Sequence, residues 1–285
     1  MPFLPNRKPV KTSTPHKPRP AVFDLDPKHH RGQNFLIDGN ILRKIVAAGD
    51  ILPEDHVVEV GAGNGGLTIE LAKHAGQVTA VEIDKDLIPV LEKATAELEN
   101  VTIVKDDIMA VPNTTLSPDG KPYKVIANIP YSLTSLIIRK FLSQTPRPSL
   151  MVLLIQKEVA QRIVAKAGDL NILALSVQYY ATPSLLFTVS RNCFWPKPNV
   201  DSAVIKIVLN PSEQLPSPAE EEWFFKVVHA GFAAKRKLLA SNLAQGLDIS
   251  KEKVLTAFTE LGLNEKIRAE DASVQQWIEL ARKIA

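Results

Sequence analysis

The fold is decided by the stretch Val57-Val58-Glu59-Val60-Gly61-Ala62-Gly63-Asn64-Gly65-Gly66, which is followed by a helical pattern over residues 67–74. An apolar strand, a glycine turn and a helix form the arrangement in which a nucleotide-like ligand lies over a helix N-terminus. Glycine is needed where the backbone approaches a ligand closely or takes a positive φ. Gly61, Gly63 and Gly66 also fit the dinucleotide pattern G-x-G-x-x-G, so the glycines alone leave NAD and S-adenosylmethionine equally open.

Two further apolar segments each end in an acidic residue. Residues 78–81 lead into Glu82, and residues 101–104 lead into Asp106-Asp107. A carboxylate about 20 residues after such a glycine turn accepts hydrogen bonds from the hydroxyls of a ribose, which is the role we expect for Glu82. We expect Asp107 to bind the adenine amino group of the same ligand; the alternative for a strand-terminal acid is a helix cap.

A fourth apolar segment, residues 123–127, ends in Asn128-Ile129-Pro130-Tyr131. The exocyclic amine of a nucleobase is a poor nucleophile because its lone pair is delocalised into the ring. The Asn128 side-chain oxygen and the Ile129 carbonyl can accept hydrogen bonds from the two N–H groups of such an amine, which returns electron density to nitrogen. Pro130 stiffens the turn, and Tyr131 offers a flat face on which a base stacks.

These groups all fall at the carboxyl ends of strands, where the ligands of open α/β sheets bind. Their combination predicts a methyltransferase with S-adenosylmethionine as donor and a base amine as acceptor. An NAD oxidoreductase is the remote alternative. Asp38 is a plausible cap for a helix that runs to about residue 48 and stops at Gly49.

The rest of the chain alternates strands and helices and then becomes wholly helical. Strands are predicted over residues 150–155, 185–189 and 203–209, the last of them antiparallel, and residues 111–122 form a loop. This alternation predicts a mostly parallel, Rossmann-like α/β sheet with helices on both faces. Later helices are predicted over residues 220–234, 238–246, 251–261 and 272–284, after a linker at 211–218. We therefore expect a tail (1–29), a methyltransferase domain (30–210) and a small helical domain (211–285).

Composition limits the class of protein. The chain has 285 residues, 45% of them hydrophobic, which is enough for one large domain and a small one. The single Cys193 excludes an internal disulfide, and no Cys/His spacing fits zinc, so we expect no metal and a cytoplasmic location. No apolar stretch approaches the length of a membrane span, and the first residues lack the apolar core of a secretory signal. We expect a monomer.

Basic residues are concentrated in two places. Residues 1–31 contain seven Lys and Arg against two Asp, with prolines throughout, so we expect this tail to be disordered until it meets a partner such as a phosphate backbone. A solvated tail without function is an equal alternative, and a transit peptide a weaker one. Lys235-Arg236-Lys237 joins the first two C-terminal helices, where we expect it to bind nucleic-acid backbone.

A proline-stiffened loop between the last two strands carries two large rings, Phe194 and Trp195. We expect Phe194 to stack on the second face of a flipped base, opposite Tyr131. We expect Trp195 to pack into the core. The alternative is that both rings fill the core beneath the loop.

The chain resembles the ribosomal RNA adenine N6-dimethyltransferases, in particular the bacterial branch that acts on 16S rRNA. The motifs that carry the resemblance are Gly32-Gln33-Asn34-Phe35-Leu36, Glu59-Val60-Gly61-Ala62-Gly63-Asn64-Gly65, Val81-Glu82-Ile83-Asp84, Asp107-Ile108-Met109, Asn128-Ile129-Pro130-Tyr131, Phe194-Trp195-Pro196-Lys197-Pro198-Asn199-Val200-Asp201-Ser202-Ala203-Val204, and Phe232 with Lys235-Arg236-Lys237.

The resemblance implies a class I S-adenosylmethionine-dependent methyltransferase fold with a helical C-terminal domain. It also implies donor contacts by Asn34, Leu36, Gly61, Glu82, Asp107 and Asn128. Family members dimethylate two adjacent adenosines in a loop near the 3′ end of 16S rRNA, within the small subunit or its precursor. The long N-terminus has no counterpart in that pattern, and Ile129 replaces the commoner Leu.

Other functions remain open at this point. A 23S rRNA adenine N6-methylase of the macrolide-resistance type shares the motifs as far as Tyr131, but the segment at Phe194 and the C-terminal helices fit it less well. A methylase of protein glutamine uses a similar turn, and the basic helical part argues against it. A non-catalytic ribosome-assembly factor would not need Glu82, Asp107 and Asn128.

Overall fold

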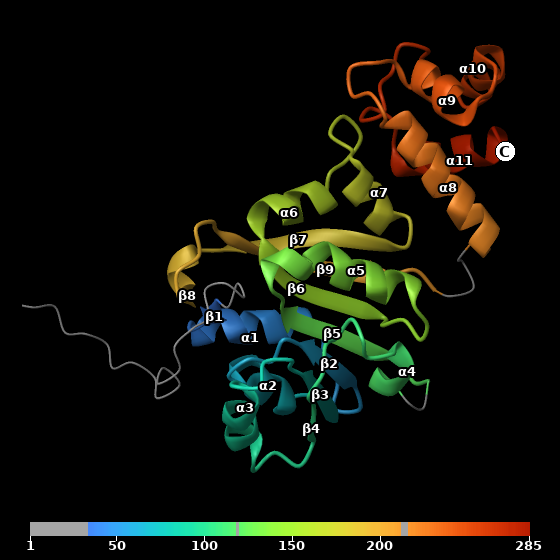
Figure 1. The fold of residues 1–285 in the computed structure, drawn as a ribbon. Helices are drawn as coiled ribbons and strands as arrows, with labels where there is room; N and C mark the ends of the chain where they lie inside the picture. The colour runs from blue at the N-terminus through green and yellow to red at the C-terminus, as the bar shows by residue number, and fades with distance from the viewer. Residues whose placement is uncertain (1–33, 118–119, 212–215) are drawn as a thin grey trace, which may run out of the picture.

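The computed structural model describes residues 34–117, 120–211 and 216–285. Within these residues, helices cover both faces of a central sheet, and a group of helices follows at the C-terminal end (Figure 1). The predicted tail, together with Gly32 and Gln33 of the first motif, lies outside the described residues. No helix in the described part of the chain is both long and apolar enough to cross a membrane.

The described strands form a seven-stranded sheet in the order β4-β3-β2-β5-β6-β9-β7, as predicted mostly parallel. Only β9 runs antiparallel to its two neighbours. The chain winds outward from the centre in both directions, so β2 and β5 lie at the point where the strand order reverses. Ligands of such sheets bind at that switch point. The strands are β2 (His56–Val60), β3 (Gln77–Val81), β4 (Val101–Val104), β5 (Tyr123–Asn128), β6 (Leu150–Gln156), β7 (Ala181–Val189) and β9 (Ser202–Leu209).

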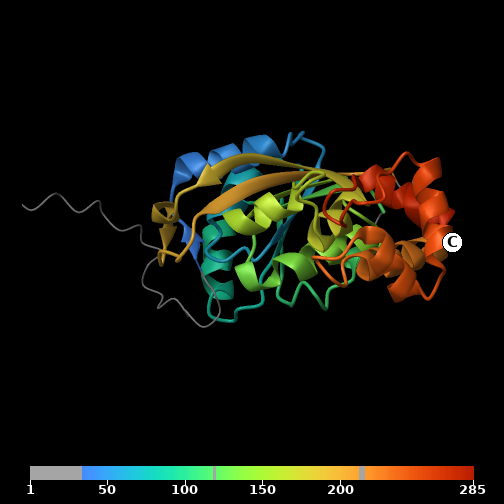
Figure 2. The same ribbon diagram turned by 90° about the horizontal axis from the view of Figure 1, so that it is seen from above.

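Helices from the two halves of the sheet lie on opposite faces, as Figure 2 shows for α1 and α5. The helices are α1 (Gly39–Ala48), α2 (Gly66–Ala72), α3 (Ile88–Thr95), α4 (Asn113–Leu116), α5 (Thr134–Ser143), α6 (Lys157–Ile163) and α7 (Ile172–Gln178). Asp38 caps α1 and Gly49 ends it, as predicted.

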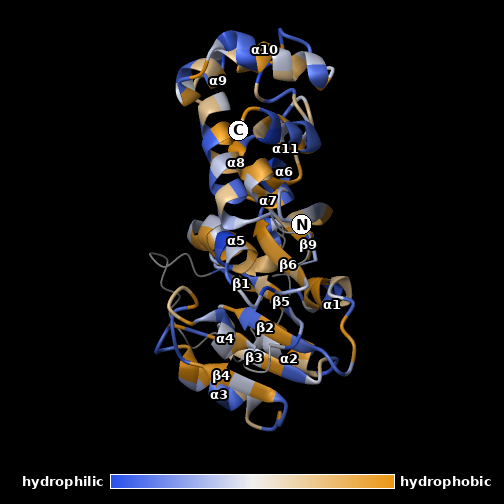
Figure 3. Cartoon of the chain, turned by 90° about the vertical axis from the view of Figure 1, so that its right-hand side faces the viewer, coloured by the Kyte–Doolittle hydropathy of each residue, from blue (hydrophilic) through white to orange (hydrophobic). Residues whose placement is uncertain are grey.

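The core is built by alternation along strands that are buried on both faces. On β5, Val125 and Ala127 pack with α5, whereas Ile126 packs on the other face with α1. Strands buried on both faces read as continuous apolar runs, and the hydrophobic colour in Figure 3 accordingly follows β5 and β6. Burial on both faces fixes the register of β2 and β5, and with it the position of the turns at their carboxyl ends.

The C-terminal helices share the core of the sheet. They are α8 (Pro218–Gly231), α9 (Leu239–Leu247), α10 (Lys251–Glu260) and α11 (Val274–Lys283), and Ser217 begins α8 with a capping box. Tyr179, at the end of α7, stacks on Phe224 of α8 with ring centroids 4.1 Å apart. One hydrophobic cluster contains buried residues of β5 and α5 as well as Trp277 of α11. The domain boundary at residue 210 stays a prediction.

Three features differ from the expectations. The predicted loop at 111–122 contains the short helix α4. Strand β7 begins four residues earlier than predicted. Its amino half alternates exposed and half-buried residues, so it does not form the continuous apolar run that marks the other buried strands. A second small sheet pairs β1 (Phe35–Leu36) with β8 (Phe194–Trp195), which brings together segments about 160 residues apart. A two-residue strand has no periodicity, so such a pairing leaves no local signal.

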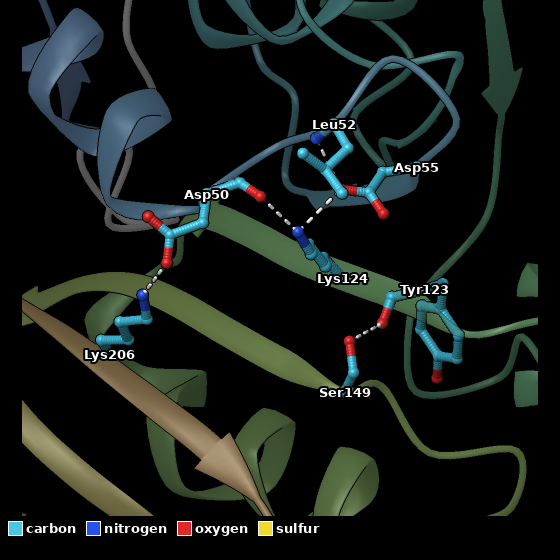
Figure 4. Close-up of polar contacts among 7 residues, drawn as sticks. All are labelled: Asp50, Leu52, Asp55, Tyr123, Lys124, Ser149 and Lys206. Atoms are coloured by element: carbon cyan, nitrogen blue, oxygen red, sulfur yellow. Dashed lines mark hydrogen bonds and ion pairs between the residues drawn. The ribbon is translucent and has the colours of Figure 1, made fainter.

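Lysines fasten the amino-terminal edge of the sheet (Figure 4). Lys124 donates to the carbonyl of Asp50 at 2.6 Å and to the carboxylate of Asp55 at 2.7 Å. Lys206 of β9 pairs with the carboxylate of Asp50, and this hydrogen bond lowers the pKa of Asp50. The α1–β2 connection is thereby joined to β5 and β9, at the edge opposite the predicted site.

Gly231 provides a stability prediction. A Cβ there would lie 2.3 Å from the ring of Trp277 and 2.9 Å from Leu239, both fully buried. Alanine normally stabilises a helix relative to glycine, but here overpacking wins, so Gly231→Ala should cost about 2 kcal/mol in urea unfolding. Gly39 is exposed in the first turn of α1 and has room for a Cβ. Gly39→Ala should therefore be neutral or stabilising, and equal effects at both positions would contradict the packing account.

Candidate functional site

A cavity opens at the carboxyl ends of β2, β3 and β5, at the switch point of the sheet. It brings together most of the predicted site residues, although they come from four separate parts of the chain. Its lining residues are Asn34, Phe35, Leu36, Leu42, Glu59, Gly61, Ala62, Gly63, Asn64, Gly66, Leu67, Glu82, Asn128, Ile129, Pro130 and Tyr131. Asp107 and Phe194 are not among them.

The glycine turn after β2 forms one wall of the cavity. Gly61 and Gly63 both have positive φ angles, +72° and +58°, which residues other than glycine rarely adopt. A Cβ on Gly63 would lie 3.3 Å from the ring of Phe35, which also lines the cavity. The missing side chains therefore keep open a cradle in which backbone can approach a ligand.

Glu82 holds this turn in place. Its Oε2 accepts a hydrogen bond from the Gly63 N–H at 2.8 Å, and its Oε1 accepts one from the Asp84 N–H at 2.8 Å. The residue is buried yet lines the cavity. A carboxylate has about four acceptor positions, so each oxygen retains one for a ligand hydroxyl. The geometry fits ribose recognition by a carboxylate whose orientation is fixed by backbone.

Glu59 lines the cavity, although sequence patterns did not predict a role for it. Thr68 donates to its Oε2 at 2.5 Å, and the side chain lines the cavity. Burial raises the pKa of Glu59 to about 8, with a smaller contribution from the nearby Glu82 that the Thr68 hydrogen bond opposes. An acidic residue inside an otherwise apolar strand, directly before the glycine turn, was the available signal.

The predicted acceptor turn closes the other side of the cavity. Asn128 donates its Nδ2 to the carbonyl of Asn34 at 3.2 Å, which ties the segment containing Leu36 to the end of β5. An amide whose nitrogen is engaged in this way retains Oδ1 as an acceptor for an incoming amine. Ile129 is buried, and the hydroxyl of Tyr131 lies 2.7 Å from Ser202 Oγ.

Asp107 lies outside this cavity. Its Oδ1 accepts a hydrogen bond from the Met109 N–H at 2.9 Å, so the carboxylate caps the turn that follows β4. This is the alternative that the sequence left open for a strand-terminal acid. Binding of an adenine amino group by Asp107 stays a proposal.

The loop rings are arranged differently from the expectation. Phe194 is only 3% exposed and packs in a core cluster with Leu36, because β8 pairs with β1. Trp195, expected in the core, is half-buried. Burial in this cluster keeps the Phe194 ring away from Tyr131 in this conformation, and stacking of Phe194 on a base stays a proposal. Among the described residues, no cluster of His, Cys, Asp and Glu could hold a metal ion.

Known proteins resemble this chain over most of its length. A family described as "Ribosomal RNA adenine dimethylase" matches residues 26–285. The Ribosomal RNA small subunit methyltransferase A of Dehalococcoides mccartyi (strain CBDB1) is 43% identical over 92% of this chain and 90% of its own length. The protein of the same name from Bacillus cytotoxicus is 37% identical over 95% of this chain and 97% of its own length.

Two solved structures share the fold. The 23S rRNA methyltransferase ErmE is 26% identical with a TM-score of 0.73, covering 88% of this chain and 99% of its own. A dimethyladenosine transferase from Plasmodium falciparum is 25% identical with a TM-score of 0.73, covering 86% and 95%. Together with the strand order, these similarities confirm the predicted class I methyltransferase fold. The chain belongs to the ribosomal RNA adenine dimethylase family.

Proposed function

We propose that this protein transfers methyl groups from S-adenosylmethionine to N6 of two adjacent adenosines in a 3′-terminal hairpin loop of 16S rRNA. The observation that carries the proposal is that Glu82 and the Asn128–Tyr131 turn line one cavity. A ribose-binding carboxylate and an amine-binding turn therefore face the same space. Relatives named for the small subunit are the more similar ones, at 37–43% identity, against 26% for ErmE.

The residues at the cavity fit the methyl donor. S-Adenosylmethionine supplies an electrophilic methyl group on a sulfonium. Glu82 would accept hydrogen bonds from its ribose, and the backbone at Gly61 and Gly63 would lie against its methionine part. Asn34 and Leu36 would cover it from β1, in the place to which Asn128 ties them. Asp107 would bind the adenine amino group through an acceptor position that the Met109 N–H does not occupy.

The acceptor turn would orient the adenine. Asn128 Oδ1 and the Ile129 carbonyl would accept the N6 hydrogens and aim the nitrogen at the methyl group, while Tyr131 stacks on the base. No strong general base is needed, because methylation makes the amine nitrogen acidic. In the second round the monomethylated amine has one N–H to donate. Phe194 would add a second stacking face only after its ring leaves the core.

The RNA backbone would be held by Lys235, Arg236 and Lys237, which are exposed at the end of α8. Among their described contacts, Lys235 lies 3.9 Å from Glu270, a long ion pair, and Lys237 donates to the neutral amide of Gln245 at 3.1 Å. Arg191 and Lys197 would add contacts nearer the cavity. Exposed cations that lack a close ion pair lose few contacts when they bind phosphate, which favours an RNA-facing role.

Replacing Lys235, Arg236 and Lys237 with Gln should flatten the salt dependence of RNA binding. Each phosphate contact contributes about 0.7 to the slope of log K against log salt on single-stranded nucleic acid, so the loss of three contacts should lower the slope by about two. Filter binding at several salt concentrations measures it. The control variant replaces Lys73, Lys93 and Lys105 with Gln. These lysines lie at the end of α2, in α3 and after β4, in the half of the sheet away from the C-terminal helices. An unchanged slope in the first variant would reject this surface.

One experiment tests the function itself. Labelled donor is incubated with unmethylated small subunits, naked 16S rRNA and large subunits, and the modified bases are mapped. We expect N6-dimethyladenosine at two adjacent positions near the 3′ end of 16S rRNA. Label in the large subunit would instead support the 23S alternative. We further propose a cytoplasmic location and action on the assembling small subunit; the monomeric state stays a prediction.

A further inference from the structure

The hydroxyl of Tyr131 has a partner of its own in the sheet. Its oxygen lies 2.7 Å from the Oγ of Ser202, which is fully buried at the start of β9. Tyr131 follows β5, so its side chain reaches past the end of β6 to contact β9. A hydrogen bond between two half-buried or buried hydroxyls is costly to leave unmade, because each group has given up water.

Ser202 is a rigid partner. Its backbone pairs with Gln156 of β6 on one side and Val189 of β7 on the other. The preceding residue, Asp201, is also fixed, because its carbonyl accepts from Lys157 N–H at 3.0 Å and its Oδ1 from Arg191 N–H at 2.9 Å. The Ser202 hydroxyl therefore has a defined position relative to the sheet.

The other end of the Tyr131 side chain is equally constrained. Pro130 precedes it, and the Pro130 carbonyl accepts a hydrogen bond from the Leu133 N–H at 3.0 Å. The Tyr131 carbonyl accepts a hydrogen bond at 3.1 Å from the hydroxyl of Thr134, the first residue of α5. A ring held at its backbone and at its hydroxyl has little freedom to rotate or tilt.

We propose that Ser202 is a positioning residue, which sets the plane of the Tyr131 ring on which the target adenine stacks. The hydroxyl of Tyr131 then serves as an anchor and takes no proton from the substrate. Burial raises the pKa of Tyr131, with Asp201 adding to the effect and Ser202 opposing it, so the phenol stays protonated at neutral pH. The proposal rests on the proposed function, because it assigns the ring to base stacking.

A double-mutant cycle tests this role. Tyr131→Phe and Ser202→Ala each remove one half of the same hydrogen bond and keep the ring. We expect each to lower kcat on RNA by about tenfold, with the dissociation constant of the donor unchanged. Because both changes break one interaction, the double variant should also lose about tenfold, where independent effects would give about a hundredfold. Ser117→Ala, which removes another buried serine hydroxyl bonded to the Lys121 carbonyl, is the matched control and should keep full activity.

The cycle separates the possible outcomes. Multiplied losses in the double variant, or donor affinity that falls in step with kcat, would overturn the positioning role. A Tyr131→Phe loss far larger than the Ser202→Ala loss would mean that the hydroxyl takes part in the chemistry itself. If Ser202→Ala unfolds, Ser202→Cys keeps the shape and a weak donor, and should show an intermediate kcat. Absence of rRNA methylation by the unmodified protein would instead refute the proposed function.

Discussion

Asn128→Ala should lower methyl transfer by about a thousandfold, while donor binding weakens by about tenfold and persists. The change removes the oxygen that would orient the N6 amine, so the reactants lose their attack geometry. It also removes the hydrogen bond to the Asn34 carbonyl, which ties β1 across the donor cavity. Single-turnover rates with RNA measure the first effect. Titration calorimetry with the donor measures the second.

A matched asparagine controls for loss of stability. Asn100 is half-buried and donates its Nδ2 to the carbonyls of Ala72 and Ala75, at the opposite edge of the sheet from the acceptor turn. Asn100→Ala should lower the melting temperature and leave turnover unchanged. Normal turnover by Asn128→Ala would refute the assigned role of the acceptor turn, whatever its effect on the donor.

Glu59→Gln should stabilise the protein progressively, relative to the unmodified chain, as pH rises from 4.5 to about 8. An unfolded Glu loses its proton near its ordinary pKa of 4.5, whereas the folded chain holds it until pH is about 8. The folded state thus binds more protons in this window, so the free energy of unfolding falls as pH rises. The full shift corresponds to a loss on the order of 5 kcal/mol, because each pKa unit is about 1.4 kcal/mol.

Urea unfolding at pH 5.5 and pH 8.5 measures this linkage. Glutamine keeps the shape of the side chain and cannot ionise. The free energy of unfolding of the variant, minus that of the unmodified chain, should therefore be larger at pH 8.5 than at pH 5.5. Glu97→Gln, at an exposed position after α3, is the control for replacing Glu with Gln away from the cavity. A pH-independent difference for Glu59→Gln would contradict a proton held in the folded cavity.

The sequence predicted the elements that local patterns encode. Residues 101–104 form β4 with the expected bounds, and β9, predicted to be antiparallel, runs antiparallel to both β6 and β7. Because the carboxyl ends of parallel strands lie on the same side of a sheet, the sequence predicts that Glu82 and Asn128 lie close together. Both line the cavity.

What could not be predicted depends on contacts between distant residues. Phe194 is buried because β8 pairs with β1, and neither two-residue strand carries a periodic signal. Asp107 turns its carboxylate to the Met109 N–H, a choice between ligand and backbone that the residue type leaves open. The pKa of Glu59 is raised by burial, which depends on the packing of both faces of the sheet.

The aromatic stack between α7 and α8 has a consequence for how such enzymes can be recombined. Because Tyr179 lies flat against Phe224 within a continuous apolar interior, helices α8 to α11 cannot be exchanged independently of α7. A chimera cut at the connection before α8 would place unrelated aromatic surfaces against each other. A graft of helices α8 to α11 must therefore carry with it the residues of α7 that they pack against.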